Sequence, residues 1–95
     1  MEKGSNFINE LSKDRNIINK YNDNIIEIII EKCTKNIKLL NNIGNTECIY
    51  DVPTFLLGYP LYDIEIISYN INKKLKKLGL YTIYIKPNKI YISWK

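Results

Sequence analysis

Apolar and polar residues alternate along residues 80–95, on both sides of the dipeptide Pro87-Asn88. Alternation with period two is typical of strands that bury one face, and Pro-Asn between two such runs favours a tight turn. We therefore predict a β-hairpin with a two-residue loop, in which Ile85 pairs with Ile90 and Ile83 with Ile92. The face predicted to be buried carries Tyr81, Ile83, Ile85, Ile90, Ile92 and Trp94. The face predicted to meet water carries Thr82, Tyr84, Lys86, Lys89, Tyr91 and Ser93.

Three stretches upstream of the hairpin have the three-and-four spacing of apolar residues that predicts amphipathic helices. They cover about residues 5–20, 23–41 and 62–78. The first carries a stripe of Phe7, Ile8, Leu11, Ile18 and Tyr21. The second carries a wider stripe of Ile26, Ile29, Ile30, Cys33, Ile37 and Leu40, which predicts a central helix or one that meets a partner chain. The third carries Ile64, Ile67, Ile71, Leu75 and Leu78, with Asp63 as its N-terminal cap and Gly79 as its stop.

Residues 46–62 do not have a helical pattern. The segment 47–52 can form a short strand that Pro53 ends, because proline has no backbone N–H to donate. The apolar loop 55–57 that follows is expected to press onto the core or to be held for a partner. The predicted fold class is α+β, with two or three helices packed on one face of a small antiparallel sheet made of the C-terminal hairpin and a third short strand near 47–52. We expect one domain over 1–95, in which 1–21 is a peripheral N-terminal helix and 22–95 is the compact core.

The residues that carry most enzyme chemistry are missing from the sequence. It contains no histidine, no glycine-rich phosphate loop, no nucleophile elbow and no metal-ligand spacing. Cys33 and Cys48 are too far apart for a CxxC motif, so we expect buried thiols in a reducing compartment, with a disulfide between them as the alternative. The sequence therefore predicts a protein that is not an enzyme and uses no cofactor, metal or small-molecule substrate.

Positive charge is concentrated in the last third of the chain. Residues 66–95 hold seven lysines and no acid, whereas residues 1–65 hold seven basic and ten acidic side chains. Lysines neutralise phosphates and tyrosines stack on bases, so a lysine-tyrosine surface is the candidate binding face. Its members are Lys73, Lys74, Lys76, Lys77, Tyr84, Lys86, Lys89 and Tyr91. A solvated face, a protein interface and a nucleic-acid site all remain open for it, because exposed lysine and tyrosine are also ordinary on strands.

Residues 48–95 resemble an uncharacterised family of small proteins of nucleocytoplasmic large (giant) DNA viruses. The resemblance is carried by Cys48-x-Tyr50-x-Val52-Pro53, by Gly58-x-Pro60-x-Tyr62-Asp63, by Leu78-Gly79 and by Ile92-Ser93-Trp94. It implies a viral protein made in infected host cytoplasm, either in the viral factory or later in the virion. It implies no known activity.

These observations favour a small structural or adaptor protein, with packaging in the virion as one option, that acts through contacts with a protein partner or with itself. The alternative is a nucleic-acid-binding module, because the order helix–strand–helix–hairpin resembles a winged helix with a basic wing. A membrane location is not expected, since no apolar run approaches the roughly 18 residues needed to span a bilayer. Secretion is not expected either, since residues 1–10 lack a signal-peptide layout.

Overall fold

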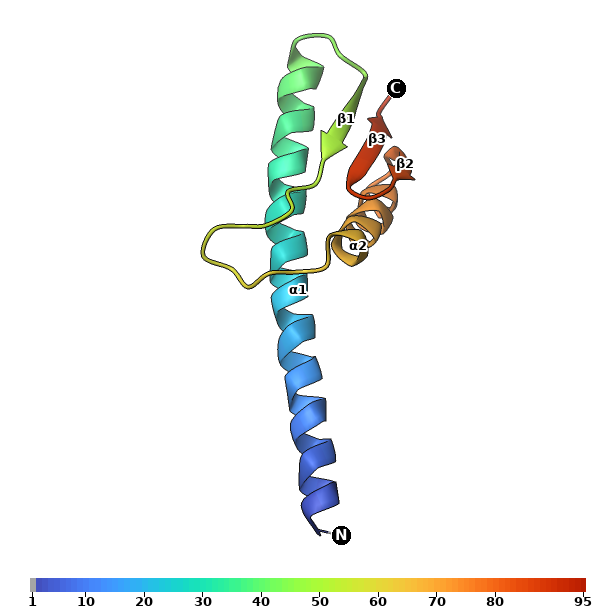
Figure 1. Ribbon diagram of the computed structural model, residues 1–95. Coiled ribbons are helices and arrows are strands. Elements are labelled where there is room, and N and C mark those ends of the chain that lie inside the picture. Colours follow the sequence, from blue (N-terminus) through green and yellow to red (C-terminus); the bar gives the residue numbers. More distant parts are fainter. Residues whose placement is uncertain (1) are drawn as a thin grey trace.

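The structure, a computed structural model, describes the backbone of residues 2–95 and the side chains of residues 22–95. It contains two helices and three strands, in the order helix–strand–helix–strand–strand (Figure 1). The elements are α1 (Glu2–Asn42), β1 (Glu47–Asp51), α2 (Ile64–Lys77), β2 (Tyr81–Ile85) and β3 (Lys89–Ser93).

The first two predicted helices are one continuous helix, α1, and the predicted break near Asn22 is wrong. Asparagine costs an interior helical position only some tenths of a kcal/mol, and no glycine or proline stands at the predicted junction to stop the helix. The helix ends where expected: Gly44 has φ +93°, and the Asn45 N–H donates to the Leu40 carbonyl at 2.9 Å. The apolar stripe predicted for residues 7–21 lies outside the described side chains.

The three strands form one antiparallel sheet in the order β1-β3-β2, so the predicted third strand is confirmed. The last strand therefore occupies the centre. The Asn88 backbone closes one end of the sheet by accepting from the Val52 N–H at 2.8 Å, while the Asn88 amide donates to the Val52 carbonyl at 2.9 Å. At the other end the Trp94 N–H donates to the Thr46 carbonyl at 3.0 Å.

The hairpin register differs by one residue from the predicted one. Tyr84 lies opposite Ile90, and Ile85 lies opposite Lys89, so the loop has three residues, Lys86-Pro87-Asn88. The two bonds between Asn88 and Val52 explain the extra loop residue, since they hold Asn88 against β1. A shift of one residue exchanges the two faces of a strand. The burial predicted for Tyr81, Ile83 and Ile85 is therefore wrong: these side chains are 63%, 47% and 44% exposed.

The prediction for α2 is confirmed almost to the residue. The Asp63 carboxylate accepts the backbone N–H groups of Glu65 at 3.0 Å and Ile66 at 3.2 Å, which satisfies two donors that the first helical turn leaves free. Gly79, with φ +95°, follows the end of the helix. Of the predicted stripe, Ile67, Ile71 and Leu75 are fully buried, while Ile64 is half-buried and Leu78 is exposed.

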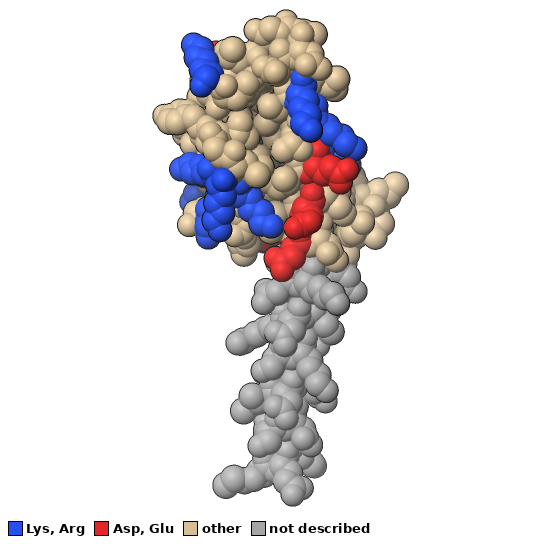
Figure 2. Space-filling model, turned by 180° about the vertical axis from the view of Figure 1, so that it is seen from behind, with Lys and Arg blue, Asp and Glu red and all other residues tan. Residues whose placement is uncertain are grey.

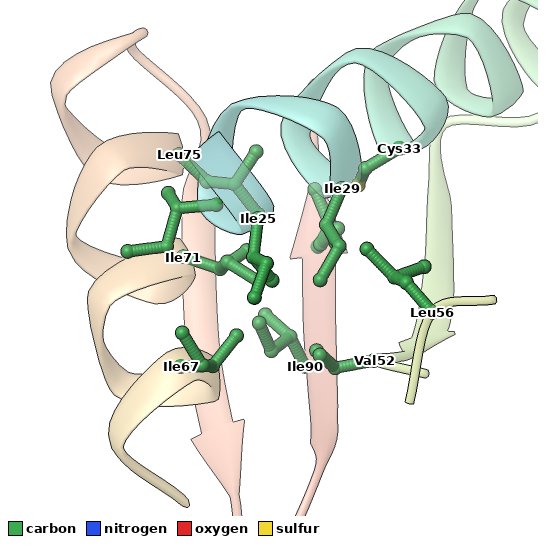
Figure 3. Packing of buried hydrophobic residues seen from close by; sticks show 11 residues of the cluster. Ile25, Ile29, Cys33, Val52, Leu56, Ile67, Ile71, Leu75 and Ile90 are labelled. Carbon is green, nitrogen blue, oxygen red and sulfur yellow. The ribbon is translucent and has the colours of Figure 1, made fainter. Parts of the chain in front are cut away.

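Both helices cover the same face of the sheet (Figures 1 and 3). The core between them takes side chains from α1, α2, β3 and the segment after β1 (Figure 3). Its members are Ile25, Ile26, Ile29, Cys33, Val52, Leu56, Ile67, Ile71, Leu75, Ile90 and Ile92. The α+β class with helices on one face of an antiparallel sheet is thus confirmed. The division into a peripheral 1–21 and a core 22–95 stays a prediction.

The apolar loop between β1 and α2 is partly packed onto the core and partly exposed. It passes across α1 (Figure 1), and Leu56 inserts into the core at 9% exposure. Its neighbours Phe55 and Leu57 are 61% and 93% exposed, and Leu61 is 87% exposed. Leu56 therefore anchors the loop, and its neighbours remain on the surface.

A small polar layer lies where α2 packs on β2. Ser68, Asn72 and Thr82 are buried there, and the oxygens Ser68 Oγ, Asn72 Oδ1 and Thr82 Oγ1 have no hydrogen-bond partner within the described residues. A buried oxygen without a partner costs about 1–3 kcal/mol relative to its hydrated state.

Replacing Thr82 with valine is expected to raise the free energy of unfolding by about 1 kcal/mol, because it exchanges the buried hydroxyl for a methyl group of similar shape. Urea denaturation of the native chain and of Thr82→Val measures the change. A matched exchange at an exposed position, Thr54→Val, should leave the stability within about 0.5 kcal/mol of native. A destabilised Thr82→Val would show that the hydroxyl has a partner.

Candidate interaction surfaces

The eight residues of the predicted lysine-tyrosine surface do not share one face. The shifted register places Tyr84 on the side of the sheet that faces α2, and places Tyr91 on the opposite side. The hydroxyl of Tyr84 donates to the Pro87 carbonyl at 2.7 Å. Beside it is a shallow depression lined by Glu65, Ile66, Tyr69, Tyr84 and Lys86. The prediction that these eight residues form one surface is therefore wrong. A binding role for them stays a prediction.

Lys89 and Tyr91 are both engaged by acids of β1. The Lys89 ammonium lies 2.8 Å from the Asp51 carboxylate, and the Tyr91 hydroxyl donates to the Glu47 carboxylate at 2.5 Å. This hydrogen bond is the main cause that raises the pKa of Tyr91 above its ordinary value, because it stabilises the protonated phenol. Lys89 and Tyr91, which were predicted to contact phosphates and bases, are thus already bonded to carboxylates.

The four predicted lysines of α2 lie together near the end of that helix. They crowd the end of the helix, where cations are favoured by its dipole. The Lys73 ammonium lies 5.2 Å from the centre of the Tyr69 ring, and the Lys74 ammonium lies 3.7 Å from the Glu27 carboxylate of α1. Lys76 and Lys77 are exposed.

The side of the sheet away from the helices is uncovered, and we call it the open sheet face. It consists of Glu47, Ile49, Asp51, Tyr81, Ile83, Ile85, Lys89, Tyr91 and Ser93. Ile49, Tyr91 and Ile83 lie side by side across the three strands. The Tyr81 ring meets the Tyr91 ring edge-on, with centroids 6.4 Å apart. The sequence pattern missed this surface, because the predicted hairpin register buried Ile83 and Ile85.

The second surface is the α1–α2 groove, which has acidic side chains of α1 on one side and lysines of α2 on the other. Figure 2 shows a group of lysines beside a column of acidic side chains. The groove has a volume of about 450 Å³ and is lined by Asn22, Asp23, Ile26, Ile66, Asn70, Lys73, Lys74 and Lys77. It adjoins a smaller hollow lined by Glu27, Ile30, Glu31 and Lys74. The four-residue spacing of Asp23, Glu27 and Glu31 was a usable signal in the sequence, but it is hidden in the summed charge of residues 1–65.

Both cysteines are free thiols, so the disulfide alternative is not formed. Cys33 is fully buried, and this burial is the main cause that raises its pKa to about 12, with a smaller contribution from Cys48. A thiol of such high pKa is almost entirely protonated near neutrality, so Cys33 is unsuited to act as a nucleophile there. Within the described residues, no three metal-binding side chains gather.

The described part of α1 and the whole of α2 lack the length of apolar sequence that would be needed to cross a bilayer.

Comparisons with known proteins agree with the resemblance found in the motifs. A sequence family described as a family of unknown function (DUF5759) matches residues 7–78. Uncharacterized protein R447 of Acanthamoeba polyphaga mimivirus is 33% identical over 73 residues, which cover 73% of this chain and 59% of that protein. The chain therefore spans well under two thirds of the length of this relative. No solved structure matches.

The predicted kinship with a giant-virus family is thus confirmed, although the matched segment differs from the predicted one. The motifs pointed to residues 48–95, whereas the family match begins at residue 7, inside α1, and ends at residue 78, before the hairpin. Most of α1 and the whole of β1 and α2 therefore fall within the matched segment. The chain belongs to the DUF5759 family and is a giant-virus protein.

Proposed function

We propose that this viral protein is a non-enzymatic structural or adaptor protein that binds a protein partner through the open sheet face. The observation that carries the proposal is the exposure of Ile49, Ile83 and Ile85, at 62%, 47% and 44%, on one side of a sheet whose other side is already covered. An antiparallel sheet with one covered face usually shows polar residues to water on the other. Contiguous exposed apolar residues mark interaction sites.

The composition of the open sheet face fits a protein partner. Tyr81 and Tyr91 add aromatic area, and tyrosine is enriched in protein interfaces. The charged groups Glu47, Asp51 and Lys89 belong to the end rows of the sheet, and the row between them is Ile49, Tyr91 and Ile83. This order of apolar centre and polar rim is that of a typical interface.

Nucleic acid is less well supported as the partner of this face. Glu47 and Asp51 place two carboxylates on it, and these repel phosphates. The proposed site of action is the infected cytoplasm or the virion, where such a protein would meet viral partners.

The double variant Ile49→Lys/Ile83→Lys tests the proposal. Both side chains are exposed, so the variant should remain folded, while two charges in the apolar row should lower recovery of a partner from infected cells by more than about tenfold. The measurement is affinity purification followed by mass spectrometry, with circular dichroism to verify folding.

The matched control is Leu57→Lys/Leu61→Lys, which adds the same charge at exposed apolar positions of the loop. Recovery of the same proteins by the native chain and by Ile49→Lys/Ile83→Lys would refute the open sheet face as the binding site. Tight binding to duplex DNA, with affinity falling at a log–log salt slope of roughly −3.6 as expected for four phosphate contacts, would favour the nucleic-acid alternative.

A further inference from the structure

We infer that two copies of this chain associate face to face through their α1–α2 grooves, with the acidic row of each copy against the basic row of the other. The acidic row is Asp23, Glu27 and Glu31, and the basic row is Lys73, Lys74 and Lys77. This surface is separate from the open sheet face, so the inference stands or falls independently of the proposed function.

The two rows run side by side along the groove. Asp23, Glu27 and Glu31 follow one another at four-residue intervals, which places them on one side of α1. The contact of 3.7 Å between Lys74 and Glu27 shows how near the rows approach each other. Both of these side chains remain largely accessible, at 47% and 75%.

The floor of the groove is formed by isoleucine and asparagine side chains. Ile26 is buried at the bottom, Ile30 is half-buried, and Ile66 is 52% exposed although it stands on a helix whose neighbouring apolar residues are covered. The Asn70 amide is held in place by donating to the Ile66 carbonyl at 3.0 Å. A partner that covered this floor would bury Ile66 and bring its own charges against both rows.

The pattern is complementary to itself. A two-fold axis that runs along the groove, in the plane of contact, exchanges its two sides in the facing copy. The acidic row of the first copy then lies opposite the basic row of the second, and each contact occurs twice. Two-fold dimers with identical contacting patches are the commonest protein oligomers. A nucleic acid lacks this complementarity, because its phosphates would meet Asp23 and Glu31 beside the lysines.

The simplest competing explanation is that the rows only attach α2 to α1 within one chain. Exposed ion pairs contribute little to stability, and only Lys74–Glu27 is formed between the two rows. Among the described residues, Asp23, Lys73 and Lys77 take part in no ion pair within the chain.

Charge-reversed variants test the dimer. The acidic variant Lys73→Glu/Lys77→Glu and the basic variant Asp23→Lys/Glu31→Lys both keep the Lys74–Glu27 pair. Each variant alone would set like charges against like charges at four places in a dimer, and we expect its dissociation constant to rise by roughly 100-fold. When the two variants are mixed, every reversed position meets an opposite charge, so a heterodimer should form. Sedimentation and light scattering measure the masses against the 11.2 kDa of one chain.

The matched control is Lys38→Glu/Lys86→Glu, which changes the net charge as much as the acidic variant but lies outside the groove lining, and it should remain dimeric. A monomeric native chain overturns the inference, and so does a mixture that fails to form the heterodimer.

If a reversed variant fails to fold, Lys77→Gln and Glu31→Gln replace it. Each should weaken the dimer and reduce its dependence on salt, and an unchanged dissociation constant overturns the inference. The Ile49→Lys/Ile83→Lys variant should dimerise normally, which separates this test from that of the proposed function.

Discussion

Replacing Ile90 with alanine is expected to lower the free energy of unfolding by about 2–5 kcal/mol, whereas the same change at Ile85 should cost less than about 1 kcal/mol. Ile90 is fully buried in the centre of the sheet, so its truncation leaves a cavity between the sheet and the two helices. Ile85 is 44% exposed at the open sheet face, where water fills the vacated space.

Urea denaturation of the two alanine variants provides the measurement, and it discriminates between the two registers. The two-residue loop would place Ile85 and Ile90 opposite each other on the same buried face, and their alanine variants would then lose similar stability. The three-residue loop places the two residues on opposite faces of the sheet. Equal losses would contradict the observed register.

The protein is expected to lose stability progressively above about pH 9, because of Cys33. Below pH 9 the thiol is protonated in both the folded and the unfolded chain, so its contribution to stability is fully present. Between 9.0, the ordinary value of its pKa, and about 12, the value that burial gives it in the folded chain, the unfolded thiol loses its proton and the buried thiol keeps it. Stability then falls by up to about 1.4 kcal/mol for each pH unit.

Urea midpoints between pH 8 and pH 11 measure this effect, with Cys33→Ala as the informative variant. It should be less stable than the native chain at pH 8, because it leaves a small cavity, but its stability should fall less steeply with pH. Burial also raises the pKa of Tyr50 from 10.0 to about 12, so a smaller slope of the same sign should persist above pH 10. The exposed control Leu57→Ala should follow the native slope, and an equal slope for Cys33→Ala would refute the assignment.

The sequence predicted the features that depend on neighbouring residues. Helix α2 was predicted with its cap Asp63 and its stop Gly79, because capping and amphipathic spacing act within a few positions. The burial of Ile90 and Ile92 and the existence of β1 were predicted for the same reason. The continuity of α1 was not predicted, although no glycine or proline stands between the two predicted helices.

The hairpin register could not be read from the hairpin alone. Asn88 is fixed by its two hydrogen bonds with Val52, which lies 36 positions earlier, and a pattern of alternation contains no information on such a contact. The predicted lysine-tyrosine surface is not formed for the same reason, since Tyr84 and Tyr91 share a face only if the loop has two residues. Ile83 and Ile85, which the two-residue loop would bury, lie instead on the open sheet face, whereas Ile90 and Ile92 are buried in both registers.

Because β3 lies between β1 and β2, neither outer strand has its partner while the ribosome is still translating the segment before residue 89. Sheet formation must therefore wait for the strand that is synthesised last of the three, and until then β1 and β2 present unpaired edges in the nascent chain. During this delay the unpaired edges are open to chaperones and to pairing with other chains.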